Sequence, residues 1–321
     1  MKLRDPRSRW LAVLVAFGLI AGLTGGTYAA FASATSNGSN SFSVKADYEG
    51  PTIVRSEIAR TTATAGGRIK ANVAYYVYAQ ITDGGNPASG VNTATTNVCT
   101  ITTATCASVA LVSGSYTVSG LSYNYRSASK TSDAGLTAGS KTYAVTSVDV
   151  AGNSSGATNF TVVVDATVPG GSNVQTANAS GGTVGLPQTN DTMTFTFTEA
   201  MDPASLKATW DGTATSVTVV LANAGCAGND TLTVTGVNLG TLCLSGNYVN
   251  GSRSFTGSTM VISGGNTVVT VTLGTPSNSF NTETTAGTMT WTPSATATDV
   301  AGNACTTTAV NEGTPPADVE F

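Results

Sequence analysis

The stretch that decides the fold is Thr192-Met193-Thr194-Phe195-Thr196-Phe197-Thr198, in which threonine alternates with large apolar residues. Successive side chains of a β-strand point to opposite faces of a sheet. This period of two therefore predicts a strand that buries Met193, Phe195 and Phe197 and presents hydroxyl groups on its other face. The same interleaving with threonine recurs at Leu232/Val234, Val269/Val271/Leu273 and Met289/Trp291.

Further β-like runs fill the chain before this stretch. They are rich in β-branched and aromatic residues, are separated by turns of Gly, Asn, Asp and Pro, and cover 72–81, 91–98, 108–118, 141–149 and 159–165. One short helical turn is predicted, because Asp202 can cap a helix whose first residue is Pro203. We therefore expect an all-β chain built from β-sandwiches.

Composition excludes several classes of function. Charged residues make up 10% of the chain, against roughly 25% in an ordinary soluble domain. The chain contains no histidine, which removes histidine-based triads, general bases and zinc sites. Its formal net charge is −4. Nucleic acid is therefore not an expected partner, because no basic excess is available to neutralise phosphates.

The N-terminus has the pattern of a secretory leader. Lys2, Arg4, Arg7 and Arg9 precede an apolar stretch from Trp10 to Leu23, and small residues follow. The apolar stretch is shorter than the roughly 20 residues that a membrane-spanning helix needs. We expect a signal peptide over 1–29 and a secreted, extracellular or cell-surface protein; retention of the segment as a membrane anchor is the alternative.

The residues after the leader carry a family resemblance. Gly25-Gly26-Thr27-Tyr28-Ala29-Ala30-Phe31, followed by Asn40-Ser41-Phe42-Ser43-Val44, resembles the start of biofilm-fibre and camelysin-type proteins, whose precursors are cut by a SipW-type signal peptidase. The resemblance implies cleavage between Ala29 and Ala30, and it implies a protein of surface fibres or of the biofilm matrix. A protease, as in the camelysin branch, is disfavoured because a zinc site here would lack histidine ligands.

Two domains are expected after the leader. Asp149-Val150-Ala151-Gly152-Asn153 and Asp299-Val300-Ala301-Gly302-Asn303 repeat each other, each after a β-rich run. With Tyr78-Ala79-Gln80-Ile81-Thr82-Asp83, this pattern resembles the bacterial immunoglobulin-like modules of surface proteins, and the segment 191–203 resembles their surface-layer variant. The resemblance implies immunoglobulin-like β-sandwiches at 50–165 and 166–321. Composition and alternation predict a flexible N-terminal segment with one strand at 30–49 before them.

That N-terminal strand is a candidate for assembly. Phe42, Val44, Ala46 and Tyr48 alternate with polar residues and are connected to the leader by a Ser/Asn/Gly-rich stretch. Such a strand can pair within its own domain or add to a sheet edge of a neighbouring copy. Residues 30–48 are therefore a candidate assembly strand, with pairing inside the same chain as the alternative.

Five cysteines lie in the exported part of the chain, where thiols oxidise. The short spacing of Cys99 and Cys106 favours a disulfide that staples a hairpin. Cys226, Cys243 and Cys305 allow three pairings, of which Cys226–Cys243 is preferred because one intervening strand returns the chain. Cys305 would then be free.

Candidate site residues are sparse, and no catalytic or cofactor-binding residue is predicted. Asp149, Asn153, Asp299 and Asn303 offer the hard oxygen ligands that Ca²⁺ prefers, although a turn held by backbone hydrogen bonds needs no ion. Glu199 and Asp202 are the acid pair that a glycosidase would need, but a strand end and a helix cap account for both. A sugar-binding platform is considered for four tyrosines, namely Tyr75, Tyr76, Tyr123 and Tyr125.

The expected function is therefore structural. The sequence favours a secreted, non-enzymatic protein of the cell surface or extracellular matrix with a structural, adhesive or fibre-assembly role. The alternative is an accessory carbohydrate- or calcium-binding module. Expected partners are other copies of the chain or components of the surface and matrix, with membrane contact only through the leader.

Overall fold

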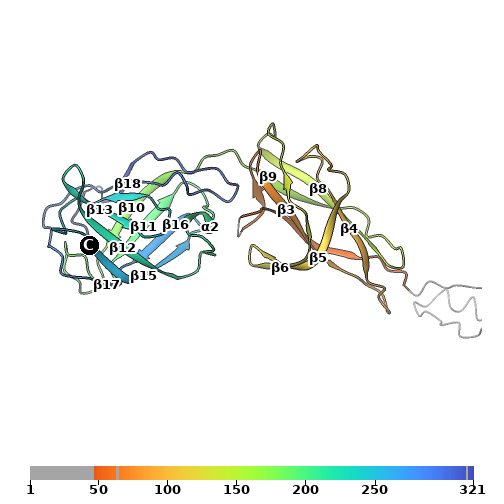
Figure 1. Cartoon of the computed structure of the whole chain (residues 1–321), viewed down its shortest axis with the longest axis horizontal. Coiled ribbons are helices and arrows are strands. Elements are labelled where there is room, and N and C mark those ends of the chain that lie inside the picture. The colour runs from red at the N-terminus through yellow and green to blue at the C-terminus, as the bar shows by residue number, and fades with distance from the viewer. Residues whose placement is uncertain (1–46, 63–64, 316) are drawn as a thin grey trace, which may run out of the picture. The chain divides into compact units, whose positions relative to one another are not determined.

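The structure is a computed structural model that describes residues 47–62, 65–315 and 317–321. The chain from Ala46 to Phe321 forms one compact unit, and its described part contains two β-sheet domains (Figure 1). The signal peptide predicted at 1–29 and nearly all of the candidate assembly strand lie outside the described residues. At the end of that segment, Asp47 and Tyr48 belong to no strand. The described residues contain no helix long and apolar enough to span a membrane.

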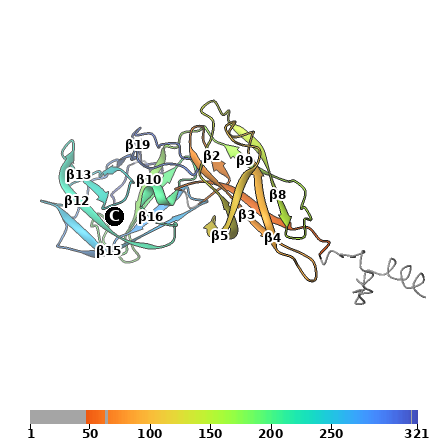
Figure 2. The same cartoon turned by 45° about the vertical axis from the view of Figure 1, so that its right-hand side comes forward.

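The first domain is a nine-stranded sheet that curves around its own core. Its strands are β1 (Thr52–Arg60), β2 (Arg68–Ile69), β3 (Ala74–Thr82), β4 (Val91–Asn97), β5 (Val109–Val118), β6 (Leu121–Ser127), β7 (Lys130–Thr131), β8 (Gly139–Asp149) and β9 (Thr158–Val164). The strand order is β1-β3-β6-β5-β4-β8-β9-β2, with β7 paired to β3. The pairs are antiparallel except for β2 and β9, which are parallel. Figure 2 shows β2 beside β9.

The second domain is a ten-stranded sheet with a separate core. Its elements are β10 (Gly171–Ala177), β11 (Thr192–Phe197), α2 (Pro203–Leu206), β12 (Thr215–Cys226), β13 (Asn229–Val234), β14 (Thr241–Cys243), β15 (Arg253–Ser263), β16 (Val268–Thr272), β17 (Thr275–Pro276), β18 (Thr290–Thr292) and β19 (Val310–Asn311). The order is β10-β11-β16-β15-β12-β13-β14-β18-β19, with β17 paired to β15. The two ends of this path approach each other, because β10 also lies against β18 and β19.

The threonine-alternating strand occupies the place that its pattern predicts. In β11, Met193, Phe195 and Phe197 are all buried, whereas the intervening threonines are half-buried. Phe195 and Phe197 meet the ring of Trp291 edge to face, with centroids 5.2 and 5.0 Å apart. The indole Nε1 of Trp291 donates to the carbonyl of Leu239 at 2.7 Å, so this buried polar atom is satisfied. The all-β prediction is confirmed, with the predicted runs becoming β3, β4, β5, β8, β9, β11, β13, β16 and β18.

The predicted helical turn is also present. Helix α2 begins at Pro203, and the Asp202 carboxylate accepts a hydrogen bond from the amide of Ala204. The proline has no N–H that would need a partner at that position. A cap and a proline therefore suffice to fix this one-turn helix between β11 and β12.

Each domain contains one disulfide. Cys99–Cys106 links the residues just after β4 to those just before β5, with the Cα atoms 4.8 Å apart. Cys226–Cys243 joins the end of β12 to β14, across the intervening β13, at a Cα separation of 5.7 Å. Cys305 is free and buried in the core of the second domain.

Candidate functional site

The first Asp-Val-Ala-Gly-Asn turn follows β8 and is held by its own hydrogen bonds. The Asp149 carboxylate accepts from the backbone N–H of Asn153 at 2.6 Å and from its Nδ2 at 2.7 Å. The same Nδ2 donates to the carbonyl of Asp47 at 3.0 Å, which ties the segment before β1 to the turn. The side-chain Nδ2 of Asn153 therefore connects the turn to the segment before β1.

Two further carboxylates meet Asp149 at this turn. One oxygen each of Asp47, Asp83 and Asp149 lies within 4.8 Å of the others, and Asp47 and Asp149 are 2% and 0% exposed. The Asp47 oxygens accept from the amides of Glu49 and Ser89. We call these three residues the N-terminal acidic cluster.

Asp83 differs from the other two members in one atom. Its Oδ2 accepts from the amide of Gly90 at 2.6 Å, but its buried Oδ1 has no hydrogen-bond partner in the described part of the chain. Neither of the two ion pairs found there involves Asp83 or Asp149. Three carboxylate groups this close together form a set of oxygen ligands that suits a bound cation.

The second turn repeats the local geometry of the first. Asp299 Oδ1 accepts from the amides of Gly302 and Asn303 at 2.6 and 2.7 Å. Asn303 Nδ2 donates to Asp299 Oδ2 at 2.8 Å and to the carbonyl of Asp165 at 3.2 Å. Asp165 therefore occupies in the second domain the place that Asp47 occupies in the first.

The second turn differs in having arginines beside it. Arg60 Nη2 lies 2.6 Å from the carboxylate of Asp202 and also donates to the carbonyl of Asp299 at 3.2 Å, while Arg60 Nε donates to the carbonyl of Val300. Arg68 pairs with Asp165 at 2.8 Å. Guanidinium groups thus supply positive charge beside the carboxylates of this turn.

The pKa of Glu199 is affected by the charged groups around the second turn. Burial, then the negative charges of Asp165 and Asp299, raise the pKa of Glu199, and Arg68 opposes them. Glu199, Asp165 and Asp299 correspond in position to Asp83, Asp47 and Asp149, but within the described residues their oxygens do not converge as closely as those of the first turn.

No protein-family model, curated protein or solved structure matches the chain.

The calcium prediction named the two turns, and the structure brings Asp149 together with Asp47 and Asp83, which sequence reasoning missed. Two spacings carry the missing signal. Asp47 stands four residues before Pro51, as Asp165 stands four before Pro169. Asp83 precedes Asn86-Pro87-Ala88-Ser89 by the same interval at which Glu199 precedes Asp202-Pro203-Ala204-Ser205.

The tyrosine platform considered for sugar binding is wrong. Tyr75 and Tyr123 are buried, so they cannot present their faces to a sugar. Tyr76 and Tyr116 make cation–π contacts with Arg126. The guanidinium of Arg126 lies 4.2 Å from the ring centroid of Tyr76 and 4.5 Å from that of Tyr116. This cation–π stack stabilises the outer surface of β3, β5 and β6.

Glu199 and Asp202 do not form a catalytic acid pair. Asp202 is 2% exposed, caps α2 and pairs with Arg60, so its carboxylate is committed to the fold. Glu199 faces Asp165 and Asp299.

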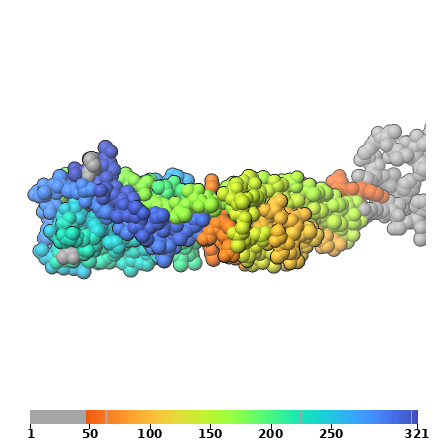
Figure 3. Space-filling model, turned by 90° about the horizontal axis from the view of Figure 1, so that it is seen from above, coloured from red at the N-terminus to blue at the C-terminus, as the bar shows by residue number. Residues whose placement is uncertain are grey.

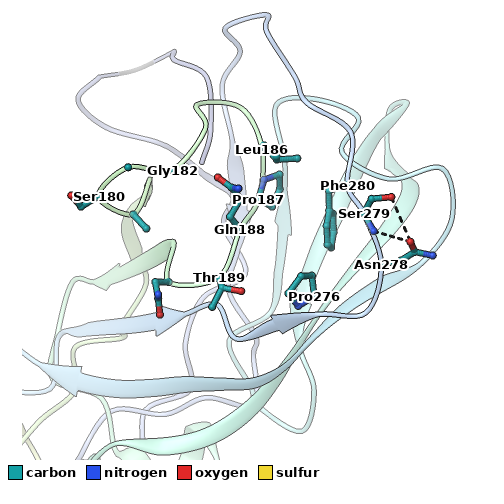
Figure 4. Close-up of a pocket in the computed structure, with 13 residues that line it drawn as sticks. Ser180, Gly182, Leu186, Pro187, Gln188, Thr189, Pro276, Asn278, Ser279 and Phe280 are labelled. Carbon is teal, nitrogen blue, oxygen red and sulfur yellow. Dashed lines mark hydrogen bonds between the residues drawn. The ribbon is translucent and has the colours of Figure 1, made fainter.

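An open hollow of about 470 Å³ lies between the loop after β10 and the residues after β17 (Figure 4). Leu186, Pro187, Pro276 and Phe280 form its apolar part, and Gln188 and Thr189 contribute polar groups. Its lining residues include no acid, base or thiol. The hollow therefore offers apolar and neutral polar groups.

Proposed function

We propose that the chain is an exported, non-enzymatic protein of the cell surface or extracellular matrix, in which two immunoglobulin-like domains serve as structural or adhesive modules. The observation that carries the proposal is that each domain is closed around its own core and contains its own disulfide. Disulfides persist in oxidising, extracellular compartments. Few charged residues and many threonine and serine hydroxyls suit a module whose role is to contact other molecules through its surface.

Cell fractionation and electron microscopy test this role. We expect the oxidised protein in the extracellular or surface fraction, starting near Ala30, with both disulfides found by peptide mapping without reductant. Purified protein should form filaments or bind surface material. A reduced protein confined to the cytoplasm would contradict the proposal.

The assembly hypothesis for residues 30–48 needs a deletion that spares Asp47. A variant lacking 30–46 should keep both folded domains but lose filament formation. If the intact protein remains monomeric at high concentration, or if the deletion unfolds the first domain, the segment belongs to its own domain and not to an intermolecular contact.

A second candidate function is calcium binding at the N-terminal acidic cluster. It is favoured by the buried, unpartnered Oδ1 of Asp83 beside the oxygens of Asp47 and Asp149. Calcium prefers such hard oxygen ligands. An ion there would join the segment before β1 to the loops after β3 and β8, and so stiffen the entry into the first domain.

Titration calorimetry with calcium chloride tests this candidate. The wild-type protein should bind the ion, and Asp83→Asn, which keeps the size of the side chain but removes its charge, should weaken binding by at least about tenfold. Asp211→Asn is the control, because Asp211 is exposed in the second domain. Equal binding by wild type and Asp83→Asn would reject the site.

A further inference from the structure

The last segment of the chain holds a second group of carboxylates, far in sequence from the first. After β19, this segment runs back along the residues before β18, with reciprocal backbone hydrogen bonds between Gly287 and Asp318 at 2.9 and 3.2 Å. The blue C-terminal part of the chain covers part of the face of the second domain that Figure 3 shows. Phe321 is buried against Tyr248, with ring centroids 5.6 Å apart.

The carboxylates of three residues of this segment, Glu312, Asp318 and Glu320, lie close together. One carboxylate oxygen of each lies within 4.8 Å of the others. Glu312 is 4% exposed and Glu320 is 0% exposed. Each of these two has one satisfied oxygen, since Glu312 Oε1 accepts from the amide of Met289 and Glu320 Oε2 accepts from the hydroxyl of Thr176.

The remaining oxygens of all three carboxylates have no hydrogen-bond partner. Glu312 Oε2, Asp318 Oδ1 and Glu320 Oε1 are all buried without one in the described part of the chain. Buried polar atoms are nearly always satisfied in folded proteins, so three orphans at one place need an explanation.

Two hydroxyl groups lie beside the carboxylates. Tyr248 is fully buried, and its hydroxyl lies close to the Ser245 side chain and to the backbone of Glu320. Burial, and the nearby charges of Glu320 and Glu283, raise the pKa of Tyr248. The hydroxyl of Ser245 is buried as well, and Ser245 packs against Gly287, whose backbone pairs with that of Asp318.

No basic side chain balances this charge. After Lys141 the sequence contains only Lys207 and Arg253 as basic residues. The two ion pairs of the described residues, Arg60–Asp202 and Arg68–Asp165, both lie elsewhere. Burial and the neighbouring carboxylates raise the pKa of Glu320, and burial comes first among the causes that raise the pKa of Glu312.

We propose that Glu312, Asp318 and Glu320 bind a divalent cation, calcium, that fastens the C-terminal segment to the second domain. Calcium binds six to eight oxygens at about 2.3–2.6 Å, so ligand oxygens on opposite sides of one ion are about 4.6–5.2 Å apart. The three carboxylate oxygens lie within 4.8 Å of one another, close enough to share one such ion. The hydroxyl of Thr176, which donates to Glu320, is a neutral oxygen at the edge of the cluster, and water would complete the shell.

A shared proton is the competing explanation. One proton between Glu312 and Glu320 would relieve their repulsion without an ion, although it would leave the buried oxygen of Asp318 unsatisfied. The two explanations differ in their response to calcium, and a substitution of glutamine for Glu320 separates them, because the amide mimics a protonated carboxyl and still donates to Glu312.

The test uses the full chain with Asp83→Asn in the background, which removes the N-terminal acidic cluster as a source of signal. Calcium chloride should raise the melting temperature of the second domain relative to EDTA, and terbium should give luminescence sensitised by Tyr248. Adding Glu320→Gln should abolish the calcium response and weaken terbium binding at least about tenfold. Asp318→Asn should weaken it too, and Asp211→Asn should not.

Near-UV circular dichroism verifies that each variant is folded. If Glu320→Gln does not fold, terbium binding by Asp318→Asn replaces it as the test, because Asp318 is less buried. If the Asp83→Asn protein shows no difference between calcium and EDTA, or if Glu320→Gln responds to calcium as its parent does, the proposal is wrong. Failure of calcium binding at Asp83 leaves this test unaffected, because the background already removes that site.

Discussion

At the scale of the residue, Cys305 shows how burial controls reactivity. Its thiol is 4% exposed, its Sγ lies 3.4 Å from the carbonyl oxygen of Thr306, and burial raises the pKa of the thiol to about 11. The thiolate is the nucleophile, so the native thiol should be inert near neutral pH. We expect iodoacetamide at pH 8 to leave the native protein unlabelled and to add one group per chain after unfolding in guanidinium chloride, as measured by mass spectrometry.

The same raised pKa sets the sign of a pH effect. An exposed thiol in the unfolded chain has a pKa of about 8.5, so the unfolded state loses this proton before the folded state does. The contribution of Cys305 to stability is therefore complete at lower pH and decreases as the pH rises above that value. In the labelling experiment, rapid reaction of native Cys305 with iodoacetamide would contradict the burial of its thiol.

At the scale of the element, α2 depends on one carboxylate with two tasks. Asp202 caps the helix and also pairs with Arg60. Asp202→Ala removes both contacts and leaves a buried guanidinium, so it should cost about 3–5 kcal/mol in the free energy of unfolding. Asp202→Asn keeps a capping group and an acceptor, and should be milder by about 1 kcal/mol. Urea denaturation measures both, and equal losses would show that the cap contributes nothing.

Elements with a local signal could be predicted from the sequence, and those without one could not. β11 is encoded by seven alternating residues, and α2 by Asp202 and Pro203. β1 was missed because Arg55, Glu57 and Arg60 interrupt its apolar pattern, and these side chains find partners only in the folded chain: Arg55 donates to the carbonyl of Ser122, and Glu57 accepts from Tyr123. The N-terminal acidic cluster was missed for the same reason, because Asp47, Asp83 and Asp149 are distant in sequence and meet only through tertiary structure.

At the scale of the whole molecule, two cores with one disulfide each predict two unfolding events. The loop closed by Cys99–Cys106 is shorter than that closed by Cys226–Cys243, which gives expected stabilisations of about 2.5 and about 3 kcal/mol in the chain-entropy model. Calorimetry should resolve two transitions. Replacing Cys99 and Cys106 by serine should lower only one of them, and replacing Cys226 and Cys243 only the other. A single transition that shifts in both variants would show that the two domains unfold as one cooperative unit.

Sodium chloride has little to screen in this protein. The described residues form two ion pairs, Arg60–Asp202 and Arg68–Asp165, and the first is buried, where mobile ions reach it least. Threonine hydroxyls, backbone hydrogen bonds, apolar cores and disulfides provide the remaining stability, and none of them weakens as ionic strength rises. The melting temperature of the calcium-free protein should therefore change little between low and high concentrations of sodium chloride.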